Sequence, residues 1–285
     1  MENQEQAENI FNEVFEFIVS WMSKRKLKLN ADKTECILFG NQHRLDMLSD
    51  FDAIDMTDNS SLPFVRKVKN LGVFLDQYLN MECQLQSTKQ KAIGNLINIS
   101  KVSKFMDKES RLKLVHGLVL SHIDFCNSLY AGLPNNKLHP LQMIINCCAR
   151  LVMGIPRFSH DRITPVCIEL HFLPLKARIK YKICLLAFKA LKYGQPAYLR
   201  ELLQYNAPTR SLRNDRTDRL VEPIVAQSSY SDRCFYACAP KMFNSLPNHV
   251  RLSDTFEIFK TRLKTFLFRE SYDLENLCIT PAFDV

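Results

Sequence analysis

The strongest constraint on the fold is a succession of helical patterns in the middle of the chain. From about residue 80 to residue 205, apolar side chains recur every three or four positions, and Gly or Pro separates one segment from the next. The whole chain of 285 residues has only 7 glycines. No G-x-G-x-x-G or G-x-x-x-x-G-K-[ST] motif occurs, so the sequence favours helices and argues against a Gly-rich phosphate-binding loop.

Several helix ends can be predicted from their residue types. Asp107 is predicted to be an N-cap, because Asp accepts hydrogen bonds from the first helical N–H groups, and the pattern predicts a helix over 107–133. Gly154 and Gly194 are predicted to end two later helices. The terminal amphipathic helix is predicted to be capped by Ser253 or Asp254.

The first 80 residues have a mixed pattern. An amphipathic helix is predicted at the N-terminus, followed by a turn at "NADK" and a short strand at "TECILFG". A polar loop or weak hairpin is expected over 41–64, and "VRKVKNLGVFLD" predicts a strand, or two strands around Gly72. Together with the helical middle, this predicts an α+β fold that is predominantly helical, with a small β part.

The composition narrows the classes of function. The formal charge of +8 is compatible with a nucleic acid or another anionic partner, and equally with a solvated basic surface. No run of about 18 apolar residues occurs, so no membrane partner is expected. The acidic, polar N-terminus is unlike a signal peptide, so we expect an intracellular protein, nuclear or cytoplasmic, whose ten cysteines are mostly free thiols. No Cys or His spacing typical of a zinc site occurs, and neither a metal site nor a cofactor is expected.

Six stretches carry a resemblance to a known family. "SWMSKRKLKLNADKTECILFG" precedes "VKNLGVFLDQYLN", and "LHPLQMIINCCARLVMGIP" precedes "LHFLPLKARIKYKI". The C-terminal part adds "APKMFNSLPNHVR" and "FKTRLKTFLF". In this order, the stretches resemble the C-terminal part of the reverse transcriptase of non-LTR (LINE-type, Jockey-like) retrotransposons.

The resemblance implies a division into three parts. Residues 1–79 would be a palm remnant that carries the fourth and fifth polymerase motifs. Residues 80–205 would form a helical thumb and post-thumb region, and residues 206–285 a mixed C-terminal module that ends in an amphipathic helix. The strands of the palm remnant would normally pair with a hairpin that this sequence lacks, so an unpaired edge and exposed apolar surface are expected there.

The resemblance also implies an RNA-directed DNA polymerase whose catalytic centre is missing from this sequence. The family binds two Mg²⁺ ions with an early Asp and an adjacent Asp-Asp pair, and this sequence contains no adjacent Asp-Asp. By itself the chain is therefore expected to be a truncated transposable-element fragment that does not polymerise. It would retain affinity for RNA or an RNA/DNA duplex. The alternative is a host-retained helical module that binds another protein and has no nucleic-acid function.

The candidate contacts to nucleic acid follow from charge and from the resemblance. A basic cluster at Lys24, Arg25, Lys26 and Lys28 could meet phosphates or form a solvated helix end. By motif match, Lys33 would lie near the phosphates of the incoming nucleotide.

The remaining candidates lie in two later stretches. The resemblance places Leu71, Gly72 and Val73 against the primer strand. A further basic stripe is predicted on the helix over 175–193, where no acidic residue occurs between Glu169 and Glu201. Its candidate contacts are Lys176, Arg178, Lys180 and Lys182.

Overall fold

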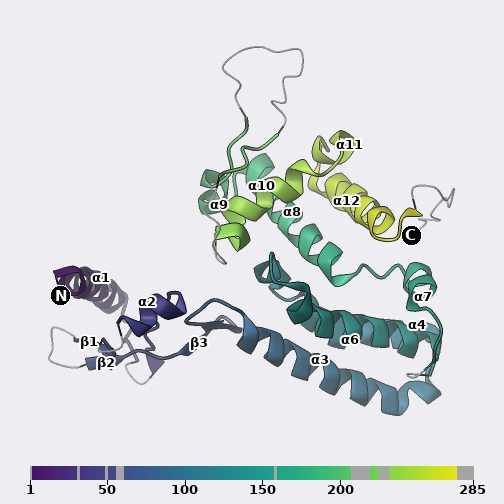
Figure 1. Cartoon of the computed structure of the whole chain (residues 1–285), viewed down its shortest axis with the longest axis horizontal. Coiled ribbons are helices and arrows are strands. Elements are labelled where there is room, and N and C mark those ends of the chain that lie inside the picture. The colour runs from purple at the N-terminus through teal and green to yellow at the C-terminus, as the bar shows by residue number, and fades with distance from the viewer. Residues whose placement is uncertain are drawn as a thin grey trace. The chain divides into compact units, whose positions relative to one another are not determined.

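The computed structural model (Figure 1) describes residues 2–30, 33–48, 51–55, 61–156, 159–206, 219–224 and 231–274. Of these residues, 64% are helical and 7% lie in strands, which form two small two-stranded sheets. The predicted class, α+β and predominantly helical, is therefore confirmed. The chain divides into two compact units, unit 1 (Met1–Gln84) and unit 2 (Leu85–Val285), while the three-part division stays a prediction.

Unit 1 combines a long helix with two hairpins. Its elements are α1 (Glu2–Lys24), α2 (Gln42–Asp46), β1 (Ala53–Asp55), β2 (Ser61–Pro63), β3 (Lys67–Asn70) and β4 (Val73–Asp76). β1 pairs with β2, and β3 pairs with β4, both antiparallel. The alternative of two strands around Gly72 is thus the correct one.

The predicted strand at "TECILFG" is wrong as a regular strand. The segment forms one isolated parallel bridge between Cys36 and Phe64, and the N–H of Gly40 donates to the carbonyl of Gln77 at 3.0 Å. A strand is maintained by a ladder of hydrogen bonds to neighbouring strands. Among the described residues this segment has only such single contacts, so apolar, β-branched character alone does not make it a strand.

Unit 2 is helical apart from one isolated β-bridge in its described part. The long helix α3 (Glu82–Val102) enters it from unit 1. The elements that follow are η2 (Ser103–Phe105), α4 (Lys108–Leu114), η3 (Val115–Leu120), α5 (Ser121–Asp124), η4 (Asn127–Tyr130), α6 (Asn135–Met153), α7 (Ile163–Glu169), α8 (Leu175–Tyr193), α9 (Ala197–Glu201), η5 (Ser231–Arg233), α10 (Phe235–Asn244), α11 (Asn248–Arg251) and α12 (Phe256–Ser271).

Most predicted helix ends in unit 2 are confirmed. The Asp107 carboxylate accepts a hydrogen bond from the Ser110 N–H at 3.3 Å at the start of α4. Gly154 and Gly194 end α6 and α8 with φ of +70° and +67°, in the left-handed region that glycine tolerates.

Two predicted boundaries are wrong. The single helix expected over 107–133 contains a π-helical stretch, η3, and ends at α5, because Cys126 takes a left-handed φ of +51°. Thr255, rather than Ser253 or Asp254, caps α12, since its hydroxyl accepts the Ile258 N–H at 3.3 Å. The Ser253 hydroxyl instead donates to the Val250 carbonyl at 2.7 Å.

The core of unit 2 is organised around α8. This helix contacts α6, α9, α10 and α12, and Figure 1 shows α8, α10 and α12 grouped together while α3 and α6 run side by side. The rings of Phe188 and Phe259 stack at 4.1 Å between centroids, and Phe243 lies 6.1 Å from Phe259. In the described residues, no helix has the length and apolar content needed to cross a membrane.

Candidate nucleic-acid interface

The first candidate group is the basic cluster at the end of α1, in unit 1. The Leu27 N–H donates to the Met22 carbonyl and the Lys26 N–H to the Ser23 carbonyl, each at 3.0 Å. This pair of bonds is a Schellman motif, and it places Lys26 at the left-handed position with φ of +60°. Because glycine is the usual residue there, a lysine at this position is strained.

The side chains of this cluster are available to a partner. Lys24, Arg25, Lys26 and Lys28 are all exposed, and none forms an ion pair with a described residue. The Arg25 guanidinium lies 3.9 Å from the centre of the Trp21 ring, in a cation–π contact that holds it against α1. The helix end therefore presents four cations within five residues.

Lys33 lies a few residues further on. Its side chain is exposed, and its backbone N–H donates to the Asn30 carbonyl at 3.2 Å. The Thr34 hydroxyl donates to the same carbonyl at 2.9 Å, so Asn30 organises the turn that carries the lysine. Two of the four residues of "NADK", residues 31 and 32, lie outside the described residues.

Leu71 and Gly72 form the two-residue turn of the β3–β4 hairpin. Their φ values of +46° and +90° are the pair of positive angles that a type I′ turn requires. Asn-Gly is the favoured pair in such turns, whereas Leu is strongly disfavoured. Leu71 is also 93% exposed, while Val73 is buried beneath the hairpin. A strained, fully exposed leucine at a hairpin tip is an unusual feature that local packing does not explain.

Asp76 holds this hairpin against the start of α3, a role the sequence analysis missed. Its buried carboxylate accepts backbone N–H groups from Tyr78, Asn80 and Met81 at 2.9–3.2 Å. The buried side chain of Gln84 accepts the Phe74 N–H at 2.9 Å. The final Asp of "LGVFLD" therefore has a structural role. The turn that follows it in the sequence is the feature that could have indicated this role.

The four candidates on α8, in unit 2, differ in their exposure and in their ion-pair partners. Arg178 donates to the Asp124 carboxylate at 2.7 Å and to the Leu173 carbonyl at 2.8 Å, and its side chain is only 11% exposed. Lys180 pairs with Glu270 of α12 at 3.0 Å and lies 5.6 Å from the centre of the Phe266 ring. Lys176 is exposed and Lys182 is partly exposed, and neither has an ion-pair partner among the described residues.

The structure thus separates the candidates into two sets. Lys24, Arg25, Lys26, Lys28, Lys33 and the hairpin tip belong to unit 1, and the α8 residues belong to unit 2. Within α8, Arg178 and Lys180 have internal partners that stabilise the packing of unit 2. Lys176 and Lys182 are left to contact a phosphate.

Polar residues of the motifs in unit 2 also have structural partners. The Gln142 side chain of α6 accepts the Leu175 N–H at 2.7 Å at the start of α8, and donates to Asn146 at 2.9 Å. The buried Asn244 side chain bonds both the N–H and the carbonyl of Leu220, at 2.9 and 2.8 Å. These amides connect segments that are distant in the sequence.

The described cysteines are free, and several of them are deeply buried. The nine cysteines among the described residues are free thiols. Burial raises the pKa of Cys148 and Cys184 to about 12 and that of Cys238 to about 11, so these thiols stay protonated at neutral pH. In the described part of the chain, no group of three or more His, Cys, Asp or Glu side chains could hold a metal ion.

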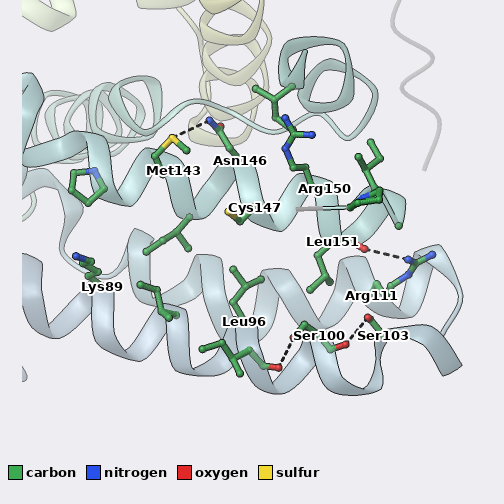
Figure 2. Close-up of a pocket in the computed structure, with 18 of the residues that line it drawn as sticks. Lys89, Leu96, Ser100, Ser103, Arg111, Met143, Asn146, Cys147, Arg150 and Leu151 are labelled. Atoms are coloured by element: carbon green, nitrogen blue, oxygen red, sulfur yellow. Dashed lines mark hydrogen bonds between the residues drawn. The ribbon is translucent and has the colours of Figure 1, made fainter. Parts of the chain in front are cut away.

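Unit 2 also has a groove that the sequence analysis did not predict. It lies between α3 and α6, with a volume of about 1150 Å³, and Figure 2 shows side chains of both helices pointing into it. Its floor is apolar, and its charged lining residues are all basic.

Comparisons with known proteins returned no match, whether with models of protein families, with curated protein sequences or with solved structures.

Proposed function

We propose that this chain is the C-terminal part of a non-LTR retrotransposon reverse transcriptase, which binds RNA or an RNA/DNA duplex without polymerising by itself. The proposal rests on the order of the motifs in the sequence. The main structural observation that supports it is in unit 1, where the cations from Lys24 to Lys33 are exposed and have no carboxylate partner among the described residues. Unpaired cations of this kind bind backbone phosphates and release counterions.

The hairpin tip in the same unit adds support. A leucine in the left-handed region costs about 1–2 kcal/mol relative to a residue that tolerates it. Strained backbone positions cluster at functional sites. We propose that Leu71 contacts the sugar or base face of a bound strand, while Gly72 allows the backbone to approach it closely.

The same proposal explains why no polymerisation is expected. Nucleotide addition needs carboxylates that hold two Mg²⁺ ions beside the attacking and leaving oxygens. The Asp-Asp pair that supplies them in the family has no counterpart in this sequence. Lys33 could bind a phosphate, but an isolated lysine cannot replace these ions.

Fewer cations are available to a nucleic acid than the sequence alone indicates. Arg178 and Lys180 already pair with Asp124 and Glu270, so removing either would disturb the packing of unit 2. We therefore propose that unit 1 supplies most of the phosphate contacts, and that Lys176 and Lys182 add weaker ones.

An electrophoretic shift with a salt titration tests the proposal. The full chain is mixed with a labelled RNA/DNA heteroduplex and compared with the triple variant K24Q/K26Q/K28Q. Each lost phosphate contact should lower the slope of log affinity against log salt by about 0.9, so the triple variant should lose about 2–3 units of slope.

The matched control is Lys113→Gln, which removes an exposed lysine that pairs with Glu109 at 2.6 Å. It should leave both affinity and slope unchanged. The nucleic-acid proposal fails if the full chain gives no shift at low salt, or if the triple variant binds as the unaltered chain does. Primer extension by the purified chain with Mg²⁺ would contradict the proposed lack of polymerisation.

A further inference from the structure

The groove between α3 and α6 has the geometry of an unfilled position in a helical bundle. On α3, four of the lining residues follow one another at intervals of four, three and four positions: Lys89, Ile93, Leu96 and Ser100. On α6, four of the lining residues have intervals of three, four and three: Pro140, Met143, Cys147 and Arg150. Alternating intervals of three and four mark the seam that a helix presents to another helix. Both helices therefore present a seam to the same empty space.

The floor of this groove is apolar and open to solvent. Ile97 and Met143 keep 49% and 46% of their surface exposed, although they lie on the two helices that form the groove. In a closed three-helix arrangement such side chains would be covered. The groove therefore presents an apolar surface that a third helix could bury.

The charged side chains along the groove are Lys89, Lys104, Arg111 and Arg150. None of the four forms an ion pair with a carboxylate in the described residues. Arg111 and Arg150 donate to backbone carbonyls, those of Leu151 and Asp161, at 3.2 and 2.8 Å. The buried Nη1 of Arg150 has no acceptor among the described residues. The groove therefore favours a helix that carries acidic side chains.

Helix α1 has the complementary surface. Its residues Ile10, Val14, Phe17 and Trp21 are 63%, 52%, 70% and 44% exposed, and they follow one another at intervals of four, three and four. These intervals place them on one stripe of the helix, at the same spacing as the seams of the groove. The stripe is apolar, and the described residues leave it uncovered.

The charge of α1 also matches. The helix contains five glutamates and a single lysine, Lys24, in its last turn. Glu13 is three positions from Ile10 and four from Phe17, so it lies beside the apolar stripe on the helix surface. An acidic edge along an apolar stripe is what the basic, apolar groove would bind.

We propose that α1 of a second copy of this chain docks into the groove between α3 and α6, so that the protein self-associates. Phe17 and Val14 would lie on the floor near Met143 and Ile97, and Glu13 would face the cations of the groove. A reciprocal arrangement, with each copy donating α1 to the other, gives a closed dimer. The inference does not depend on the proposed nucleic-acid binding, whose cations begin at Lys24, after the apolar stripe.

Sedimentation velocity on the full chain tests this inference, after nuclease treatment to remove associated nucleic acid. The unaltered chain should form a dimer in a concentration-dependent manner. Phe17→Glu removes the donor surface and Met143→Glu blocks the groove, because each places a charge in an apolar contact. Each variant should raise the dimer dissociation constant by about tenfold or more. Tyr198→Glu, at a residue of α9 that is 68% exposed, is the matched control and should leave association unchanged.

Mixing the two variants gives the decisive measurement. The Phe17→Glu chain keeps an intact groove and the Met143→Glu chain keeps an intact α1, so an equimolar mixture should form a heterodimer through one contact. Far-ultraviolet circular dichroism identifies any variant that fails to fold, and Ile97→Glu then replaces Met143→Glu. A monomeric unaltered chain overturns the inference, and so does a dimer that persists in both variants or a mixture that stays monomeric.

Discussion

The two units differ in how much apolar surface they bury. In unit 2, large side chains such as Tyr130, Phe172 and Phe259 are completely buried. In unit 1, the described hydrophobic residues that are buried are Ile54, Val73 and Met81, and the apolar stripe of α1 is exposed. Hydrophobic burial is the main source of stability, so unit 2 can maintain its own fold. Unit 1 depends more on backbone hydrogen bonds, and it keeps apolar surface available for partners.

The largest predicted effect contrasts one phenylalanine in each unit. Phe259→Ala should destabilise unit 2 by about 3–5 kcal/mol, because it leaves a cavity beside Phe188 and Phe243. Phe17→Ala removes the same atoms from a side chain that is 70% exposed, and should change the free energy of unfolding by no more than about 0.5 kcal/mol. Denaturant titration followed by circular dichroism measures both changes.

This pair of variants tests whether the two units differ in buried apolar surface. If Phe17→Ala were as damaging as Phe259→Ala in a dilute sample, α1 would already be packed against another surface of the monomer. Equal effects would therefore also argue against a second copy as the occupant of the groove.

The next prediction concerns the hydrogen bonds that support unit 1. Asp76→Asn should destabilise unit 1 by about 1–3 kcal/mol, since the amide NH₂ group replaces one of the two oxygens that accept backbone N–H groups and cannot itself accept them. Hydrogen exchange at residues 67–81 should accelerate, while the amides of α8 should be unaffected. Faster exchange in α8 as well would mean that the two units unfold together.

Helix positions in unit 2 could be predicted because their signals are local. Apolar spacing, the Asp107 cap and the left-handed glycines at 154 and 194 all act within a few residues. The strand at "TECILFG" failed for the opposite reason, since a strand needs partners from elsewhere in the chain.

The basic stripe of α8 shows the same limit for the candidate site. The absence of acidic residues between Glu169 and Glu201 suggested unpaired cations, yet Arg178 pairs with Asp124 and Lys180 with Glu270. These partners are 54 and 90 positions away in the sequence. The groove was missed for a related reason, because neither α3 nor α6 forms it alone.

A smaller effect, of opposite sign, is predicted at the hairpin tip. Leu71→Asn should stabilise unit 1 by about 1 kcal/mol, because Asn-Gly is the favoured pair for a turn with two positive φ values. If Leu71 contacts a nucleic acid, the same variant should bind an RNA/DNA heteroduplex more weakly although it is more stable. Stability is measured by denaturant titration and binding by the electrophoretic shift. A gain in stability with unchanged affinity would mean that Leu71 has no role in binding.

The smallest predicted effect is a pH dependence of unit 2 through His116. Desolvation, together with the charges of Arg178 and Lys264, lowers the pKa of this histidine below its ordinary value of 6.5, while Asp124 opposes the shift. The imidazole lies edge-on to the Phe172 ring, 5.4 Å between centroids, although the residue as a whole is exposed. Because the folded state disfavours protonation of His116, the unfolded chain binds more protons below about pH 6.5. The free energy of unfolding of unit 2 therefore decreases as the pH falls below this value.

His116→Gln should remove this part of the pH dependence and leave the stability of unit 2 near pH 8 almost unchanged. Nuclear magnetic resonance titration of the imidazole gives the pKa directly. A value above 6.5 would mean that Asp124 outweighs burial at this position, and stability would then rise on acidification instead.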